Sequence, residues 1–372
     1  MKSISNKRIL FIGGASFATY SFRASLFKDL VSRHYDVFVI CSDSETRKEI
    51  EELGTTFFEV PFNNRSLNPF SFSKIVKSFR SIIKKVNPNL VFTYQLKGNL
   101  FGSKAACLEQ KPFICLNEGL GDGFGNKRTL IGRFIRRSSI ILHRRHLKHA
   151  FKVFVINPDD KEFFLQNRLC TEEQIELING VGVDCEKFQL CELPDNFSVI
   201  NVSRLVKTKG VIDYCEIARR VRKKDSSITF KLVGPDGDLS ENDIKPYIDS
   251  KDIVYLGFAN DVRPCIKESS VIVLPSYREG FGISLVEGAA MGRPGIAYDV
   301  VGPKYFIIDD KTGYLIPFKD YDSFVEKILL LKSDRKKLEW MGKEARDNVI
   351  NKCDSKSINK TIIFNIEKCL IK

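Results

Sequence analysis

Two glutamates eight positions apart lie on either side of a glycine-rich loop in the last third of the chain. Glu279 is in the loop that follows the apolar run 271–274, and Glu287 is in a segment, 283–291, that is expected to be a helix. The apolar run predicts a buried parallel strand, and the loop glycines let backbone amides approach a ligand closely. A helix that begins directly after such a loop presents free N–H groups and the positive end of its dipole, which suits a phosphate.

A pair of basic residues occupies a similar place earlier in the chain. Arg204 and Lys209 lie between a strand-like run, 197–202, and a helix expected from about 211 to 221. Charge-assisted hydrogen bonds from both side chains, together with amides at the start of the helix, would hold a diphosphate. Lys207 is a weaker third candidate, and solvent-facing cations are the alternative interpretation.

Composition limits the class of protein. A chain of 372 residues with 43% hydrophobic and 28% charged residues suits two globular domains. No segment approaches 18 consecutive apolar residues, and the first residues lack the apolar core of a signal peptide, so we expect a cytoplasmic protein. Ten cysteines are scattered without metal-ligand spacing, which favours free thiols in a reducing compartment.

The net charge of +13 calls for an anionic partner, and the basic residues are concentrated in one stretch. Residues 127–152 hold nine Lys/Arg, three histidines and no acid, with apolar residues interleaved as in an amphipathic helix. We interpret this stretch as a surface for anionic lipid headgroups, with a solvated helix face as the alternative. Arg144, Arg145 and Lys148 between the histidines oppose a metal site, and no nucleic-acid-binding motif is present.

Strand-like and helical segments alternate along both halves of the chain, beginning with the apolar run 8–12 and a helix that ends near residue 31. Such alternation predicts parallel sheets covered by helices on both faces, the α/β class. Gly13-Gly14, at the first turn, is not the dinucleotide fingerprint, so no NAD is expected. A second glycine-rich loop follows the apolar run 113–117 and includes Glu118. Loops at the carboxyl ends of such strands host ligands.

The segment from Ser276 to Glu287, with Gly292-Arg293-Pro294 and the run 310–315, resembles the donor-sugar motif of family 4 retaining glycosyltransferases. The run 179–188 is similar to the family's interdomain segment. The resemblance implies the GT-B fold, two Rossmann-like parallel-sheet domains facing across a cleft. We expect an N-terminal domain over 1–188, a C-terminal nucleotide-sugar domain over 197–353, and a last helix, 354–372, returning to the first domain.

The resemblance also implies roles for single residues. Glu279 would bind and stabilise the donor sugar, Arg204 and Lys209 would stabilise the leaving diphosphate, and Glu287 would bind the ribose. The other expected donor-binding residues are Gly280, Phe281, Gly282, Ile283, Ser284, Gly234 and Phe258. Gly13, Gly14 and Arg23 are expected to contact an acceptor diphosphate, and Glu118 is expected to contact substrate. Arg23 as a plain surface residue and Glu118 as a solvated carboxylate are the alternatives. The mechanism implied needs neither a metal nor a cofactor.

Within the family the chain looks most like bacterial enzymes that extend lipid-diphosphate-linked saccharides. The resemblance implies a UDP-sugar donor, such as an N-acetylhexosamine, and a role in O-antigen, capsule or other glycan assembly. It also implies peripheral attachment to the inner face of the cell membrane through the basic stretch. Two other functions remain open at this point: a UDP-N-acetylhexosamine 2-epimerase of the same fold, and a catalytically silent nucleotide-sugar-binding protein.

Overall fold

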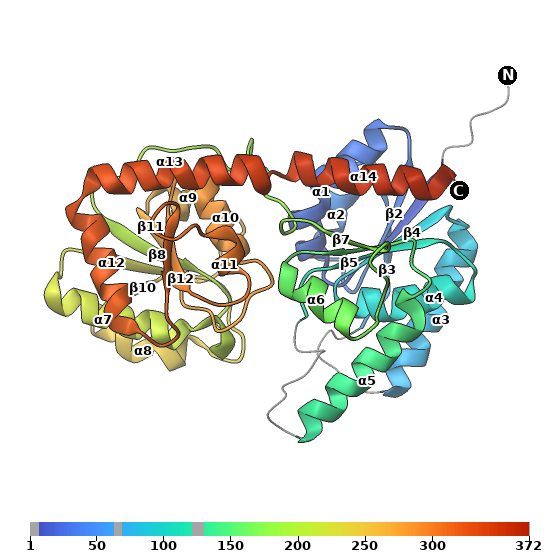
Figure 1. Ribbon diagram of the computed structural model, residues 1–372, viewed down its shortest axis with the longest axis horizontal. Helices are drawn as coiled ribbons and strands as arrows, with labels where there is room; N and C mark the ends of the chain where they lie inside the picture. Colours follow the sequence, from blue (N-terminus) through green and yellow to red (C-terminus); the bar gives the residue numbers. More distant parts are fainter. Residues whose placement is uncertain (1–6, 63–68, 121–129, 372) are drawn as a thin grey trace. The chain divides into compact units, whose positions relative to one another are not determined.

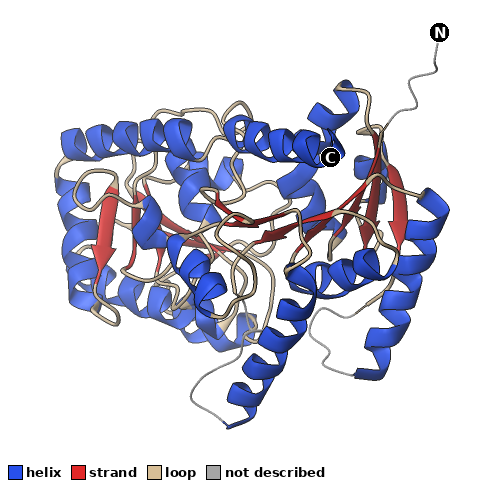
Figure 2. Ribbon diagram, turned by 45° about the vertical axis from the view of Figure 1, so that its right-hand side comes forward, coloured by secondary structure: helices blue, strands red, loops and turns tan. Residues whose placement is uncertain are grey.

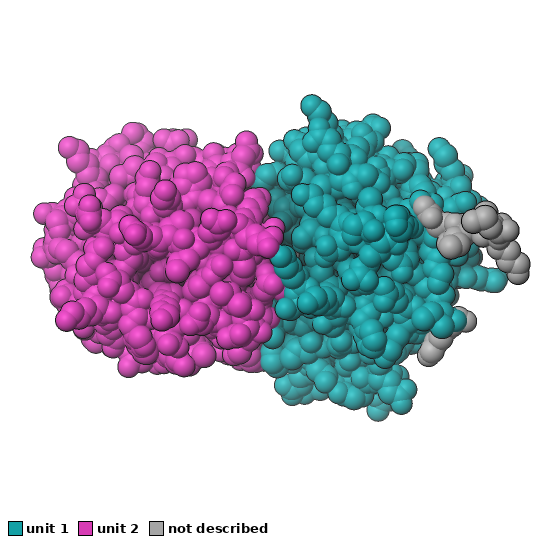
Figure 3. Space-filling model, turned by 90° about the horizontal axis from the view of Figure 1, so that it is seen from above, with its two compact units in different colours: residues 1–182, 355–372 teal, residues 183–354 magenta. Residues whose placement is uncertain are grey.

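The computed structural model describes residues 7–62, 69–120 and 130–371. The chain divides into two compact units, coloured separately in Figure 3. Unit 1 comprises Met1–Gly182 together with Ser355–Lys372, and unit 2 comprises Val183–Asp354.

Unit 1 is built on a seven-stranded parallel sheet with the strand order β3-β2-β1-β4-β5-β6-β7. Helices α3, α4 and α5 cover one face, and α1, α2 and α14 cover the other (Figure 1). Its elements are β1 (Arg8–Ile12), α1 (Ser16–Ser32), β2 (Asp36–Cys41), α2 (Arg47–Glu51), β3 (Thr56–Glu59), α3 (Pro69–Val86), β4 (Leu90–Tyr94), η1 (Gly98–Gly102), α4 (Ser103–Leu108), β5 (Phe113–Asn117), α5 (Leu130–Leu147), β6 (Lys152–Val155), α6 (Pro158–Gln166), β7 (Ile175–Leu177) and α14 (Ser355–Ile371).

Unit 2 is built on a six-stranded parallel sheet with the order β10-β9-β8-β11-β12-β13. Its strands, red in Figure 2, lie between helices α7, α8 and α12 on one side and α9, α10 and α13 on the other. Its elements are β8 (Ser198–Val202), η3 (Lys207–Lys209), α7 (Val211–Lys224), β9 (Thr229–Val233), α8 (Glu241–Asp249), β10 (Val254–Tyr255), α9 (Arg263–Lys267), β11 (Val271–Leu274), α10 (Ile283–Ala290), β12 (Gly295–Tyr298), α11 (Pro303–Phe306), β13 (Gly313–Ile316), α12 (Tyr321–Ser333) and α13 (Arg335–Lys352).

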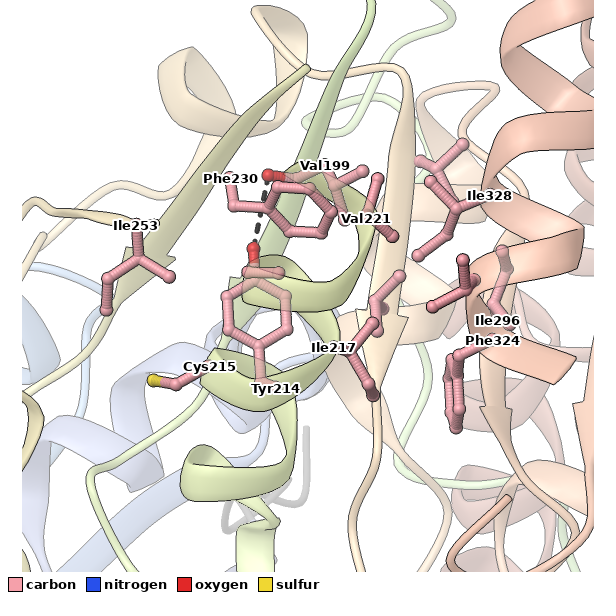
Figure 4. Close-up of a cluster of buried hydrophobic side chains, with 14 of the residues drawn as sticks. Val199, Tyr214, Cys215, Ile217, Val221, Phe230, Ile253, Ile296, Phe324 and Ile328 are labelled. Carbon is pink, nitrogen blue, oxygen red and sulfur yellow. Dashed lines mark hydrogen bonds between the residues drawn. The ribbon is translucent and has the colours of Figure 1, made fainter. Parts of the chain in front are cut away.

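The core of unit 2 holds the helices on the sheet at fixed positions (Figure 4). Strand and helix side chains such as Val199, Phe230, Ile217 and Phe324 are fully or almost fully buried, because parallel strands covered on both faces must be apolar throughout. The hydroxyl group of Tyr214 donates to the backbone oxygen of Val199 at 3.2 Å, so a polar group inside this core has its partner. Helix α7 is therefore anchored against β8.

The predicted α/β class with two Rossmann-like domains is confirmed, and each sheet contains one point where the strand order reverses direction. In unit 1 that point lies between β1 and β4, and in unit 2 it lies between β8 and β11. In open parallel sheets the loops at the carboxyl ends of these two strands diverge and leave a crevice for ligands. The two reversal points are therefore where a site is sought.

Candidate active site

The reversal point of unit 2 brings Lys209 and Glu279 together. The Nζ atom of Lys209 lies 2.6 and 2.7 Å from the two carboxylate oxygens of Glu279. The Lys209 side chain is 27% exposed and that of Glu279 is 8% exposed, so the pair is partly shielded from water but reachable from it. A cation and a carboxylate at this edge of the sheet could bind a phosphate and a sugar hydroxyl, respectively, once they separate.

Two tight loop contacts place this pair. The amide of Tyr277 donates to the backbone oxygen of Thr208 at 2.9 Å, which joins the β11 loop to the β8 loop. Gly210, directly after Lys209, has φ +66°, and a Cβ there would lie 1.8 Å from the backbone oxygen of Pro275. Only glycine permits this approach, so the sequence Lys-Gly fixes where Lys209 stands.

Glu279 is bounded on its other side by the loop after β12. Gly302 has φ +100°, and a Cβ at this position would lie 2.7 Å from the Cβ of Glu279. The amide of Glu279 donates to the backbone oxygen of Val301 at 3.3 Å, a long hydrogen bond. The carboxylate is therefore held mainly by packing and by Lys209.

The glycine-rich loop then turns into α10. Phe281 is buried, with its ring centroid 6.2 Å from that of Phe306, so its aromatic ring serves the packing of unit 2. Gly282 adopts φ +84° as the N-cap residue and provides no side chain to cap the helix. Its neighbours Ile283 and Ser284 therefore begin the helix with amides that lack a side-chain acceptor, next to the half-buried Gly280. These amides are suited to an anionic group.

Arg204 follows β8 and is exposed. Among the described residues its guanidinium group has no hydrogen-bond or ion-pair partner, whereas Lys209 is already engaged. The structure places both cations in the same loop. A partner-free guanidinium at a sheet reversal point is available for bidentate contact with phosphate oxygens.

Glu287 lies in the second turn of α10 and is half-buried. Burial raises the pKa of its carboxyl group to about 7, the nearby negative charge of Asp261 adds to the rise, and Lys187 opposes it. A carboxyl group that titrates near neutral pH is a frequent property of functional sites, because burying an ionised group without a close partner is unfavourable. Glu287 is thus poised to accept hydrogen bonds from a ligand's hydroxyl groups.

Gly234 and Phe258 lie at the ends of neighbouring strands. A Cβ at Gly234, which has φ +150°, would lie 1.9 Å from the backbone oxygen of Ser203, so glycine is required here by chain packing. The amide of Gly234 donates to the oxygen of Gly257 at 2.9 Å, and Phe258 follows with its side chain half-exposed. The exposed part of the Phe258 ring could stack against a planar group, while Gly234 shapes the loop.

At the reversal point of unit 1, side chains of the protein itself occupy the positions next to the glycine turn and the start of α1. A Cβ at Gly13 would lie 2.2 Å from the ring of Tyr94, so this glycine makes room for a buried tyrosine. The backbone oxygen of Gly14 accepts from the amide of Ser42 at 2.8 Å. The amide of Ser16, at the start of α1, donates to the carboxylate of Asp43 at 3.2 Å. The helix N-terminus already has an anionic partner in the chain itself.

Arg23 and Glu118, both predicted to contact substrate, form an ion pair in unit 1. The Arg23 side chain is 2% exposed, donates to Glu118, and lies 5.4 Å from the ring centroid of Tyr94. Burial raises the pKa of the Glu118 carboxyl group, and Arg23 counteracts this rise. The remainder of the glycine-rich loop, 121–125, lies outside the described residues. Arg23 is therefore not a plain surface residue, and the pair occupies the place where an acceptor group was expected.

Sequence reasoning missed Tyr94 and Asp43, which determine the chemistry of this edge. Both residues follow or end apolar strands, the position that also identified Lys209 and Glu279. A search of all strand ends for polar side chains could have found them. No group of three or more metal-ligating side chains occurs within residues 7–62, 69–120 and 130–371.

Helix α5 carries most of the basic stretch, whose residues 148–152 follow the helix and whose residues 127–129 lie outside the described part. His143 and His146 are buried, and burial lowers the pKa of each to about 4, with nearby cations contributing at His146. Phe134 is 73% exposed, and Ile141, also exposed, lies seven residues further on the same helical face. The exposed cations around them are Arg133, Arg137, Arg144, Arg145 and Lys148. No described helix is long and apolar enough to cross a bilayer.

Comparison with known proteins agrees with this geometry. A family model described as glycosyl transferases group 1 matches residues 185–348, and one described as glycosyl transferase 4-like matches residues 8–157. An N,N'-diacetylbacillosaminyl-diphospho-undecaprenol alpha-1,3-N-acetylgalactosaminyltransferase of Campylobacter jejuni is 28% identical over 92% of this chain and 94% of its own. A UDP-Gal:alpha-D-GlcNAc-diphosphoundecaprenol alpha-1,3-galactosyltransferase of Escherichia coli is 27% identical over 87% of each.

Solved structures share the fold. A glycosyltransferase from Rickettsia africae superposes with a TM-score of 0.78 at 20% identity, covering 98% of this chain and 99% of the other. The Anabaena protein Alr3699/HepE, in complex with UDP and glucose, gives a TM-score of 0.80 at 17% identity, covering 98% and 100%. Two Rossmann-like units with a cationic, carboxylate-bearing strand edge thus define a nucleotide-sugar-dependent glycosyltransferase of the GT-B fold.

The chain is thus a glycosyltransferase with a 4-like domain followed by a group 1 domain. The resemblance to family 4 that the sequence around Glu279 suggested is thereby confirmed, and so is the assignment as an enzyme.

Proposed function

We propose that this glycosyltransferase moves a sugar, an N-acetylhexosamine in the first instance, from a UDP-sugar to a saccharide carried on a lipid diphosphate. The observation that carries the proposal is the grouping of Arg204, Lys209 and Glu279 on the two loops at the reversal point of unit 2. Cations next to a carboxylate at that point suit a diphosphate joined to a sugar.

The reaction separates a sugar from a diphosphate, on which negative charge builds as the glycosidic bond breaks. Arg204, Lys209 and the first amides of α10 would stabilise that charge, and preorganised donors of this kind lower the barrier most. Glu279 would release Lys209 to the diphosphate and turn its carboxylate to the sugar hydroxyl groups. Glu287 would accept hydrogen bonds from the ribose.

The names of the relatives support the acceptor and the stereochemistry. Both the Campylobacter and the Escherichia enzymes carry names that specify an alpha-1,3 linkage to a sugar on diphospho-undecaprenol. Common UDP-hexoses are alpha anomers, so an alpha product corresponds to retention of configuration. We assign the same course to this chain, with a role in bacterial surface polysaccharide or glycan assembly.

A lipid-linked acceptor requires the enzyme to work at a membrane surface, and α5 offers a suitable face. Phe134 and Ile141 project an apolar centre, the exposed arginines and Lys148 surround it, and α5 contains no acidic residue. Each cation near an anionic leaflet contributes about 1 kcal/mol, so four or five suffice for reversible attachment. We propose peripheral association with the cytoplasmic face of the cell membrane and no nucleic-acid partner.

A UDP-release assay with a panel of nucleotide sugars tests the reaction, each sugar supplied with and without an undecaprenyl-diphosphate saccharide. Acceptor-dependent UDP release, with an alpha linkage in the product, is expected, and EDTA should leave the rate unchanged. Release abolished by EDTA and restored by Mg²⁺ contradicts the metal-free course. Conversion of UDP-N-acetylglucosamine alone to its 2-epimer contradicts the transfer reaction itself.

Cosedimentation with vesicles tests the membrane surface. Binding should be strong with phosphatidylglycerol and weak with phosphatidylcholine alone. A variant carrying Phe134→Ser, Arg133→Gln and Arg137→Gln should lose most of this binding. Lys223→Gln with Lys224→Gln removes two exposed charges from unit 2 and serves as the control. Equal loss of binding in both variants would refute a role specific to α5.

A further inference from the structure

A buried carboxylate in unit 2, outside the predicted site, collects an unusual number of hydrogen bonds. Asp213, in the first turn of α7, is 2% exposed. Its Oδ1 atom accepts from the hydroxyl groups of Tyr277 and Tyr321, each at 3.0 Å, and its Oδ2 atom accepts from Tyr298 at 2.8 Å. The ammonium group of Lys319 bridges both oxygens at 2.7 and 2.8 Å. We refer to these five residues as the Asp213 cluster.

The cluster connects the two loops of the candidate active site. Asp213 lies four residues after Lys209, and Tyr277 lies two residues before Glu279. The hydrogen bond between Tyr277 and Asp213 therefore ties the start of α7 to the loop that carries the sugar-facing carboxylate. Tyr298 ends β12, and Lys319 follows β13, so three strand ends meet at one buried charge.

Donor binding makes this tie important. The carboxylate of Glu279 is held by Lys209 at 2.6 Å. A diphosphate that takes Lys209 removes this anchor, and the remaining backbone contact of Glu279, to Val301, is a long 3.3 Å. Two residues before Glu279 on the same loop, Tyr277 is attached at both ends, because its amide is bonded to Thr208 and its hydroxyl group is bonded to Asp213.

We propose that Tyr277, through its hydrogen bond to Asp213, is a positioning residue that keeps Glu279 directed at the donor sugar after Lys209 has moved to the diphosphate. The inference rests on the proposed function. It predicts a defect in sugar transfer that exceeds any defect in UDP binding, because the nucleotide contacts do not depend on the Tyr277 hydroxyl group.

The hydrogen bonds of the Asp213 cluster should not change with pH in the neutral range. Burial raises the pKa of Tyr277 and of Tyr321, and it raises the pKa of Tyr298 further, so all three phenols stay protonated. Burial opposes ionisation of Lys319, but hydrogen bonds to Asp213 and the tyrosines outweigh it and raise the pKa of the lysine. The ammonium group of Lys319 therefore stays charged through the neutral range.

The conformation of Lys319 shows that the cluster constrains the chain locally. Its φ of +68° is uncommon for a residue with a side chain. The Lys319 ammonium group also donates to the Tyr277 hydroxyl group at 2.6 Å, and the Phe318 ring packs edge-on against Tyr277 with centroids 5.3 Å apart. Both ends of the Tyr277 side chain are therefore fixed.

The chain supplies a closely matched control for the test. Tyr277 and Tyr321 both donate to the same Asp213 oxygen at 3.0 Å, and both accept from Lys319. Tyr277→Phe and Tyr321→Phe therefore remove the same kind of bond, but only Tyr277 belongs to the loop of Glu279. Both variants should lower the melting temperature by similar amounts.

The experiment measures kcat for sugar transfer, KM for the UDP-sugar and Kd for UDP in the wild type and both variants. Tyr277→Phe should lower kcat about tenfold with UDP Kd changed less than twofold, while Tyr321→Phe keeps the wild-type kcat. Equal kcat in the two variants, or an unchanged kcat in Tyr277→Phe, overturns the inference alone. Absence of acceptor-dependent UDP release from the wild type overturns the proposed function on which it rests.

Discussion

The two units share a parallel-sheet topology, yet their reversal points hold their charges in different ways. In unit 1, Arg23 of α1 and Glu118, directly after β5, form an ion pair beside the buried ring of Tyr94, which ends β4. In unit 2, between β8 and β11, Arg204 is exposed and the pair of Lys209 and Glu279 is reachable from water. In unit 1 the two charged side chains are occupied by each other. In unit 2 Lys209 can exchange its contact with Glu279 for a contact with a ligand.

The difference arises from what lies over each glycine turn. Gly13 makes room for the Tyr94 ring, whereas Gly210 makes room for the backbone oxygen of Pro275, next to a Lys209 side chain that is 27% exposed. An ion pair with one nearly inaccessible partner, such as Arg23, is costly to break, because the remaining charge is left without a partner in a poorly solvated place. A partly exposed pair is weak and exchangeable. The comparison therefore predicts structural effects in unit 1 and functional effects in unit 2.

The largest effect is expected from Arg23→Met in unit 1. Removing the guanidinium group, which is 2% exposed, leaves the Glu118 carboxyl group, which is 19% exposed, without its partner, so the free energy of unfolding should fall by up to about 3–5 kcal/mol. Chemical denaturation measures this change, and adding Glu118→Gln should recover part of it. If stability is unchanged while KM for the acceptor rises, Arg23 contacts the acceptor and the contrast between the two edges is lost.

In unit 2, Arg204→Ala should affect turnover and leave stability intact, because the side chain is exposed. Loss of a donor to the leaving diphosphate should lower the rate about 10²–10³-fold, corresponding to about 2.7–4 kcal/mol of transition-state stabilisation. UDP release measures the rate. Lys207→Ala, an exposed lysine in the same loop, is the control and should have a much smaller effect. Near-normal turnover in Arg204→Ala would remove the leaving-group role.

Most of the fold could be predicted because buried parallel strands can be recognised in the sequence as short apolar runs. The expected strands at 113–117 and 271–274 coincide with β5 and β11, and the helix after the glycine-rich loop ends one residue earlier than expected. Helix α8 was not expected, since Pro246 lies inside it and interrupts the helical pattern. Its start is nevertheless marked by a capping box between Ser240 and Asp243.

The site was less predictable, because its decisive contacts join distant parts of the chain. Strand-end position identified Lys209 and Glu279, but their pairing across 70 residues required the three-dimensional structure. Arg23 was expected to contact an acceptor diphosphate because of the family resemblance, yet only the placement of Tyr94 and Glu118 shows that it is buried in an ion pair. Sequence patterns locate polar residues on an edge of a sheet and do not show which of them neutralise each other.

The affinity of unit 2 for UDP should depend on pH because of Glu287. Burial raises the pKa of Glu287 to about 7, so this carboxyl group is mostly protonated at pH 6 and mostly ionised at pH 8. The ionised form accepts hydrogen bonds from both ribose hydroxyl groups, so UDP affinity should increase severalfold, at most about tenfold, from pH 6 to pH 8. Calorimetry at a series of pH values measures it. Glu287→Gln should bind more weakly at pH 8 and lose this pH dependence.

The smallest expected effect is on UDP affinity in Glu279→Gln, and it tests directly whether the ion pair between Lys209 and Glu279 is exchangeable. Glu279→Gln removes the charge that holds Lys209, so the ammonium group becomes available to the diphosphate before the donor arrives. UDP should then bind about threefold to fivefold more tightly, equivalent to about 0.7–1 kcal/mol, the size of a partly exposed ion pair. Sugar transfer should nevertheless fall, because the carboxylate that faces the sugar is gone.

Asp299→Asn controls for net charge in this experiment. Asp299 follows β12 at the same edge of the sheet, is exposed, and has no bond to Lys209, so its neutralisation changes the local potential without releasing the lysine. Tighter UDP binding in Glu279→Gln but not in Asp299→Asn isolates the exchange at Lys209. Equal tightening in both would mean that only the overall potential matters. Weaker binding in Glu279→Gln would show that the pair orients Lys209 for the diphosphate and does not compete with it.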